Sequence, residues 1–141
     1  MKVNYYDPFV PSSDVATVKP TLEALVADAH YISMHTPFTP QTDGMINAAV
    51  IAKMKKGVVI VNTGRGKCVN AADMVAALTS GQVGAYATDV WPSDPPPADY
   101  PILKAPNVLM APHLGASTKE NLGRIGEEVQ TILADYVNGG K

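Results

Sequence analysis

The sequence has a single cysteine, Cys68, and therefore cannot form an internal disulfide. Such a chain is typical of a reducing compartment, so we expect a cytoplasmic protein. No apolar run approaches the roughly 18 residues of a membrane-spanning helix, and no signal segment opens the chain, which predicts no membrane partner. Eleven Lys and Arg against thirteen Asp and Glu give a net charge of −2, without a basic patch that would attract nucleic acid.

Metal-binding patterns are also lacking. The three histidines are scattered, and neither an HExxH motif nor a pair of cysteines is present. His30 precedes an apolar run and His35 ends it, where packing is the simpler interpretation. We therefore expect no metal site, and His113 is the histidine best placed for chemistry.

What the sequence does have is an alternation of short apolar runs with segments of helical spacing. With 46% hydrophobic residues in 141, it can bury the core of one domain spanning residues 1–141. Continuous apolar character, as in Val58-Val59-Ile60-Val61, is typical of a parallel strand covered on both faces. The five predicted strands are Val3 to Tyr6, Tyr31 to Met34, Val58 to Val61, Ala85 to Thr88, and Val108 to Met110.

Helical spacing separates the predicted strands. Leu22, Leu25 and Val26 follow Thr21, which can cap them, and further helices are predicted over 48–54 and 70–81. In the last helix, Ser117 and Glu120 form a capping box and apolar residues line one face up to Tyr136. Strands alternating with helices predict an α/β fold, a three-layer, doubly wound structure with helices on both faces of a five-stranded, mainly parallel sheet.

Polar or glycine-containing segments follow every predicted strand. Because ligands bind beyond the carboxyl ends of strands in such sheets, we expect a site at this edge. The segments are Asp7, His35-Thr36-Pro37, Asn62-Thr63-Gly64-Arg65-Gly66, Asp89 and Pro112-His113.

Three side chains at this edge allow both a chemical and a structural interpretation. Asp7 can accept the hydroxyls of an adenosine ribose, or it can cap the turn before Pro8. Arg65, between two glycines, offers a planar fork for a carboxylate, or it can be an ion-pair partner. His113 can exchange a proton with a hydroxyl or carbonyl, with Asp94 orienting its ring, or it can cap the following helix.

Taken together, these segments resemble the D-isomer-specific 2-hydroxyacid dehydrogenases. The resemblance runs in order over nearly the whole chain, and the stretch from Pro112 to Glu120 with Gly126 to Val129 looks like the phosphoglycerate branch. The other matching stretches are 35–37 with 39–42, Met54-Lys55-Lys56-Gly57, 61–66, 77–81, Asp89-Val90-Trp91-Pro92 and Asn107-Val108.

The resemblance implies roles for residues of this chain. Arg65 would bind the substrate carboxylate and carbonyl oxygen, and His113 would be the acid/base, with Asp94 standing where the family usually has Glu. NAD is the implied cofactor, and a 2-hydroxy acid or 2-keto acid the implied partner. The residues implied to line the cofactor are Asp7, Thr36, Pro37, Thr63, Gly64, Arg65, Asp89, His113, Leu114, Gly115 and Ala116.

One part of the family pattern does not occur. The family places a strand and a GxGxxG turn before the strand that ends at Asp7, and no GxGxxG occurs here. The chain thus resembles the later part of a Rossmann-type NAD-binding domain without most of the substrate domain. We predict that the sheet closes over the missing strand in the flavodoxin-like order 2-1-3-4-5, with the strand of Val3 to Tyr6 inside it. Exposed packing surface would favour a homodimer.

Three hypotheses about function follow. The first, implied by the resemblance, is an NAD-dependent oxidoreductase acting on the CH–OH group of a small, 3-phosphoglycerate-like 2-hydroxy acid. The second is a catalytically inactive module that folds or associates, derived from such an enzyme. The third, carried by fold analogy alone, is a flavin- or nucleotide-binding module.

Overall fold

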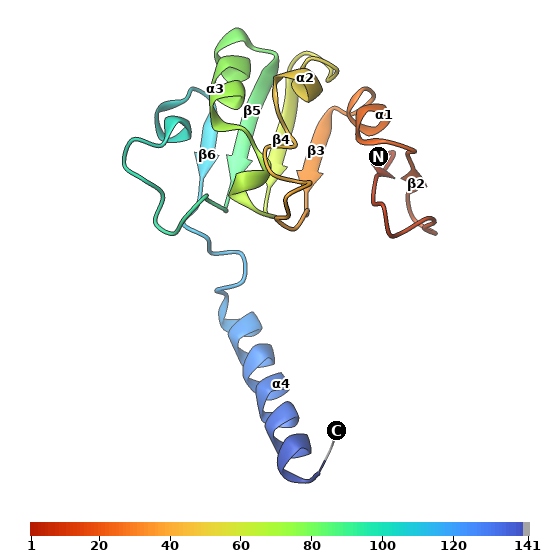
Figure 1. The fold of residues 1–141 in the computed structure, drawn as a ribbon, viewed down its shortest axis with the longest axis vertical. Helices are drawn as coiled ribbons and strands as arrows, with labels where there is room; N and C mark the ends of the chain where they lie inside the picture. Colours follow the sequence, from red (N-terminus) through yellow and green to blue (C-terminus); the bar gives the residue numbers. More distant parts are fainter. Residues whose placement is uncertain (140–141) are drawn as a thin grey trace.

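A computed structural model describes residues 1–139 of the chain (Figure 1). It contains a main sheet of four parallel strands and, beside it, a small parallel sheet of two strands. The class is therefore α/β with parallel pairing, as predicted. The strands of the main sheet, all parallel and in spatial order, are β3 (Tyr31–Met34), β4 (Val58–Asn62), β5 (Val83–Thr88) and β6 (Val108–Met110), and those of the small sheet are β1 (Asn4–Tyr5) and β2 (Thr17–Val18).

The predicted five-stranded sheet in flavodoxin-like order is wrong. It required β1 between β3 and β4, whereas these two strands pair directly along their length. β1 has a local partner instead, since the N–H of Thr17 donates to the Val3 carbonyl and the N–H of Lys19 to the Tyr5 carbonyl. Two residues of β2 give no alternation that could be read from the sequence. The hypothesis of a flavin-binding module loses the strand order that motivated it.

Two helices follow the predicted capping signals. In α1 (Leu22–Val26) the Thr21 hydroxyl accepts from the Ala24 N–H, and in α3 (Ala71–Ser80) the Asn70 side chain caps the start. Gly81 ends α3 at a φ of +72°, a conformation that favours glycine. α2 (Ala48–Ile51) is shorter than predicted. Two 3₁₀ turns, η1 (Gly66–Cys68) and η2 (Pro101–Lys104), complete this part of the chain.

The last helix, α4 (Lys119–Val137), begins one residue later than its predicted capping box. The Thr118 hydroxyl, rather than that of Ser117, accepts from the N–H of Asn121, and the Ser117 N–H donates to the Leu114 carbonyl in the preceding turn. Figure 1 shows α4 extending away from the sheet. Within residues 1–139, no helix is both long and apolar enough to cross a membrane.

The hydrophobic core lies on one face of the main sheet. Along β4, Val58 and Ile60 are buried while Val59 and Val61 are only half-buried, so alternate side chains face the core. Helices α2 and α3 supply the other half of this core through Val50, Ile51, Met74, Ala77 and Leu78. The sheet and these two helices thus form two layers with the core between them, as expected when one layer of helices packs on a sheet.

The opposite face of the main sheet carries no helix among residues 1–139, so the predicted three-layer arrangement is wrong. The strand register sets Tyr31, Val59 and Ala85 in one row and Ser33, Val61, Ala87 and Leu109 in a second row. Tyr31 and Leu109 are each 74% exposed. A shallow hollow of about 580 Å³ lies over β4, β5 and β6 on this side. We call these seven residues the bare face.

Candidate active site

The loops after β3 and β4 meet at the carboxyl edge of the sheet. A Cβ on Gly64 would lie 2.8 Å from the Thr36 carbonyl oxygen, closer than real Cβ atoms approach, so the contact requires glycine. The Thr63 hydroxyl lies 3.4 Å from Nδ1 of His35. The buried Cys68 thiol lies under the Thr36 and Pro37 carbonyls. The structure thus brings the predicted residues together at one edge of the sheet; they are Thr36, Pro37, Thr63, Gly64 and Arg65.

Asn62 holds the loop that carries Arg65. Its side chain is fully buried at the end of β4, where its carbonyl accepts from the Gly64 N–H at 3.0 Å. Its amide donates to the Arg65 carbonyl at 3.1 Å and lies 3.2 Å from the Tyr86 hydroxyl. The Arg65 guanidinium, which donates to the Gly64 carbonyl, is exposed. The sequence analysis placed Asn62 at this edge but gave it no role, although a polar residue ending an apolar strand was the available signal.

The loops after β5 and β6 form a second cluster. Both oxygens of the Asp89 carboxylate accept main-chain hydrogen bonds, from Leu114 at 2.7 Å and from Gly115 at 2.6 Å. The turn that these bonds close contains His113 at a φ of +60°, in the left-handed region that a histidine seldom occupies. Asp89 therefore stabilises the conformation of the loop from His113 to Ala116.

His113 and Asp94 form a close pair, as predicted. Nδ1 of His113 lies 2.6 Å from Oδ2 of Asp94, and both side chains are about half exposed. Because a carboxylate can only accept, this contact assigns the proton to Nδ1 and directs Nε2 of the imidazole away from Asp94. The shorter side chain of Asp94 thus still reaches the ring.

Trp91 connects the two clusters. Its indole N–H donates to the carbonyl of Ala111, two residues before His113, at 2.9 Å. A Cβ on Gly66 would lie 2.7 Å from the Trp91 Cα, so the Arg65 loop packs against the Trp91 backbone. The ring itself packs edge-to-face on Tyr100, with centroids 6.2 Å apart. The sequence analysis gave Trp91 no role of its own and missed this link.

Asp7 lies apart from both clusters. It follows β1, which belongs to the small sheet, and one of its carboxylate oxygens accepts from the Phe9 N–H at 2.8 Å. This local turn is the structural interpretation of Asp7 offered by the sequence. Being exposed, its second oxygen remains accessible to a ligand.

The remaining titratable groups near the edge are not set up as nucleophiles. Burial raises the pKa of the Cys68 thiol, so the thiol stays protonated at neutral pH. Burial likewise raises the pKa of the Tyr86 hydroxyl. Residues 1–139 contain no group of three or more His, Cys, Asp or Glu side chains that could hold a metal ion.

Comparison with known proteins identifies this arrangement. The family described as D-isomer specific 2-hydroxyacid dehydrogenase, NAD binding domain, matches residues 1–115. The chain belongs to this family. The resemblance that the sequence motifs indicated is confirmed, and the site lies at the edge of an NAD-binding domain fold.

Individual relatives agree with the family. D-3-phosphoglycerate dehydrogenase of Rattus norvegicus is 39% identical over 142 residues, 99% of this chain and 26% of the relative. The NAD complex of a formate dehydrogenase from Staphylococcus aureus matches at 35% identity with a TM-score of 0.87, covering 99% of this chain and 42% of that one. D-lactate dehydrogenase of Aquifex aeolicus, complexed with NAD and lactic acid, matches at 30% identity with a TM-score of 0.86, covering 99% and 47%. The chain spans about a quarter of the length of the phosphoglycerate dehydrogenases that it matches.

The residues present suit one end of NAD better than the other. Each Asp89 oxygen already accepts one N–H and keeps a lone pair for a carboxamide, and Thr63 offers an exposed hydroxyl nearby in sequence to Arg65. A pyrophosphate needs main-chain N–H donors at a glycine-rich turn, and the sequence has no GxGxxG. The fit is therefore to the nicotinamide end.

Proposed function

We propose that the carboxyl edge of the main sheet is the substrate end of an NAD-dependent oxidoreductase site. The substrate class is a small 2-hydroxy acid, or the corresponding 2-keto acid, of the 3-phosphoglycerate type. The observation that carries the proposal is the 2.6 Å contact between His113 and Asp94, which come from different loops. Such a pair is the arrangement that a proton-transferring imidazole requires.

Each residue has a separate part in the proposed reaction. The guanidinium of Arg65 binds the substrate carboxylate through two parallel hydrogen bonds and polarises the C2 oxygen. Nε2 of His113 removes the proton from the C2 hydroxyl during oxidation and returns it to the carbonyl oxygen during reduction. Asp94 stabilises the imidazolium that forms and keeps the ring in one orientation. Bound NAD would supply the hydride acceptor for the oxidation and, as NADH, the hydride donor for the reverse reduction.

The cofactor-lining residues stay those that the family resemblance implies. Asp89 closes the turn that positions His113 to Ala116. Gly64, which has no Cβ, lets the loop of Thr63 lie close to Thr36. Asp7, which is bonded to its own turn, would hold the adenine ribose through its second oxygen.

The test is direct. NADH is titrated while the fluorescence of Trp91, the only tryptophan, is followed, and hydride transfer is then assayed with 3-phosphohydroxypyruvate. We expect saturable binding, with turnover lost in His113→Ala and reduced at least about 100-fold in Asp94→Asn. His30→Ala is the matched control, because His30 lies at the opposite end of β3. Absence of binding at millimolar NADH would contradict the proposal.

A second candidate function is association without turnover. The observation that favours it is the bare face, together with an α4 on which no apolar residue is buried. Binding of NADH without hydride transfer, in a chain that self-associates, would favour this candidate over the first.

A further inference from the structure

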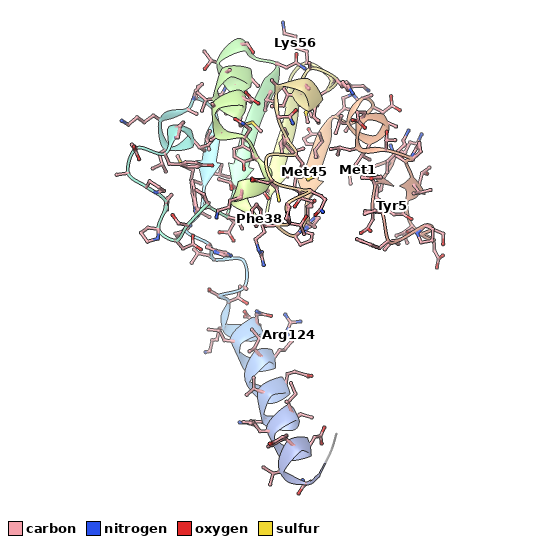
Figure 2. The ribbon with its side chains drawn as sticks, in the orientation of Figure 1. Met1, Tyr5, Phe38, Met45, Lys56 and Arg124 are labelled. Carbon is pink, nitrogen blue, oxygen red and sulfur yellow. The ribbon has the colours of Figure 1, made fainter. Side chains whose placement is uncertain are left out.

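Trp91 stands in the segment between the two clusters of the candidate active site. In the main sheet β5 lies between β4 and β6, so the chain that leaves β5 starts between the loops that follow the other two strands (Figure 1). Figure 2 shows Phe38 at this carboxyl edge and Lys56 at the opposite end of the sheet. A residue that directly follows β5 can therefore contact both the Arg65 loop and the His113 loop.

The indole of Trp91 holds the beginning of the His113 loop. Its N–H donates to the Ala111 carbonyl at 2.9 Å, directly after β6 and two residues before the imidazole. The Ala111 N–H still bonds to the Thr88 carbonyl of β5, so the indole bond holds the main chain at the point where the strand pairing ends. The position of the imidazole thus depends on this bond as well as on the contact with Asp94.

The backbone of Trp91 lies against the Arg65 loop. A Cβ on the buried Gly66 would come within 2.7 Å of both the Cα and the carbonyl oxygen of Trp91, closer than real Cβ atoms approach. The two main chains are therefore in direct contact, one residue after Arg65. Because close-packed backbone atoms leave no space to absorb a shift, a displacement of one loop moves the other.

Trp91 is itself held by its surroundings. Just before it, the buried Thr88 hydroxyl accepts from the Val90 N–H and donates to the Val90 carbonyl at 2.8 Å. Its ring packs edge-to-face on Tyr100, which packs in turn against the hydrophobic core. The ring contact and the N–H bond involve different atoms, so that one can be removed while the other stays.

We propose that Trp91 is a positioning residue, which sets the spacing between Arg65 and His113 through its contacts with Gly66 and Ala111. The inference rests on the proposed function, because the two side chains need a fixed spacing only if they act on one substrate. Once Arg65 holds the carboxylate, the spacing decides whether Nε2 of His113 reaches the C2 oxygen. A misplacement of about 1 Å can cost about 100-fold in rate, even when it arises away from the reacting atoms.

Trp91→Phe tests the indole bond, because phenylalanine keeps an aromatic ring against Tyr100 and removes the N–H donor. With NADH and 3-phosphohydroxypyruvate, kcat should fall about 10-fold or more while KM for the keto acid changes less than about 2-fold, since Arg65 still binds it. Tyr100→Leu is the matched control, which removes the ring contact, keeps the N–H bond and should leave kcat near that of the wild type. Circular dichroism verifies that both variants fold. Equal losses of kcat in the two variants, or an unchanged kcat in Trp91→Phe, would overturn the inference.

A spectroscopic measurement separates this inference from the proposed function. In long-range ¹H–¹⁵N spectra the ring C–H protons report which imidazole nitrogen carries the proton, and the spectrum of His113→Ala assigns the His113 signals. We expect the Nδ1-protonated form in the wild type and in Tyr100→Leu, and a mixture of tautomers in Trp91→Phe. Absence of turnover in the wild type would contradict the proposed function alone. A His113 tautomer unaffected by Trp91→Phe would overturn the positioning role, whether or not the chain is active.

Gly66→Ala tests the same link from the Arg65 loop. Its Cβ would press on the Trp91 backbone, so the tautomer of His113 should shift although the substitution lies in the other loop. In the double variant with Trp91→Phe the two effects should not add, because both act through one contact chain. Full additivity would show that the loops are positioned separately and would overturn the inference. If Gly66→Ala does not fold, Trp91→Phe with its Tyr100→Leu control still decides the outcome.

Discussion

The two faces of the main sheet are made of neighbouring residues in the same strands, yet their surroundings differ. Along β4, Ile60 is fully buried beneath the helices, while Val61 next to it lies on the bare face. Both side chains are β-branched and apolar, so neither composition nor propensity separates them. What separates them is whether the chain supplies a covering element. The strand signal alone therefore predicts a strand without saying how many of its faces are covered.

The largest expected difference comes from shortening each of these side chains in turn. Ile60→Ala should reduce the free energy of unfolding by about 3 kcal/mol, because it leaves a cavity among fully buried neighbours. Val61→Ala should cost less than about 1 kcal/mol, because Val61 is only half-buried. Urea denaturation of both variants gives the comparison. Equal losses would mean that the bare face is covered in solution.

A second pair contrasts a crowded glycine with an open one. Gly66→Ala should destabilise the fold by about 2 kcal/mol, because its Cβ would press on the Trp91 backbone. Gly123 lies in α4, and a Cβ at this position would meet nothing within 4 Å. Gly123→Ala should therefore stabilise the helix by roughly 0.5–1 kcal/mol, because alanine has the higher helix propensity. Thermal unfolding and circular dichroism at 222 nm measure the two effects. A neutral Gly66→Ala would show that the contact between the loops is looser than described.

A third pair contrasts polar groups on the two sides. Asn62→Ala removes three hydrogen bonds from the covered side and leaves the Gly64 N–H without its partner, so we expect a loss of about 1.5 kcal/mol. Ser33→Ala removes only an exposed contact with His35 and should cost at most about 0.5 kcal/mol. Denaturant midpoints report both losses. The idea that burial decides the cost fails if Ser33→Ala is the more harmful change.

The smallest expected effect concerns acid pH and the exposed carboxylates of and near α1. A hydrogen bond from Lys19, together with its charge, holds the pKa of Asp28 below its usual range, and its own main-chain N–H lowers that of Glu23. A lowered carboxylate pKa stabilises the fold at neutral pH, and the gain is lost below about pH 4 as the groups protonate. The melting temperature should fall there slightly less in Asp28→Asn than in wild type. If the melting temperatures of wild type and Asp28→Asn fell equally at both high and low salt, the interaction of Asp28 with Lys19 would not contribute to stability.

Local signals in the sequence predicted local structure well. Thr21, Asn70 and Gly81 mark helix ends by hydrogen bonding and backbone conformation that involve only nearby residues. The predicted contact of His113 with Asp94 is confirmed as geometry, and the family is confirmed by comparison. The roles of these two residues, of Arg65 and of the cofactor-lining residues stay predictions.

Most of the errors concern how separate elements combine. β1 pairs with the two-residue strand β2, and no pattern in Thr17 and Val18 predicts that strand. Trp91 was not predicted to organise the site, because its partner, the Ala111 carbonyl, lies 20 residues further along the chain. Asn62 bonds to the Gly64 N–H only two residues away, so in that case a local signal was missed. Two errors are local, since α2 is shorter than predicted and Thr118 rather than Ser117 caps α4.

The sequence by itself determined the α/β class, the family, the helix caps and the residues that follow each strand. These depend on periodicity, turn chemistry and motif spacing, which are properties of short segments. Only the tertiary structure decided that β1 pairs with β2, that one face of the sheet is bare, and that Trp91 joins the loops of Arg65 and His113. Those outcomes depend on which surfaces find a partner to exclude water, and that is a property of the assembled chain.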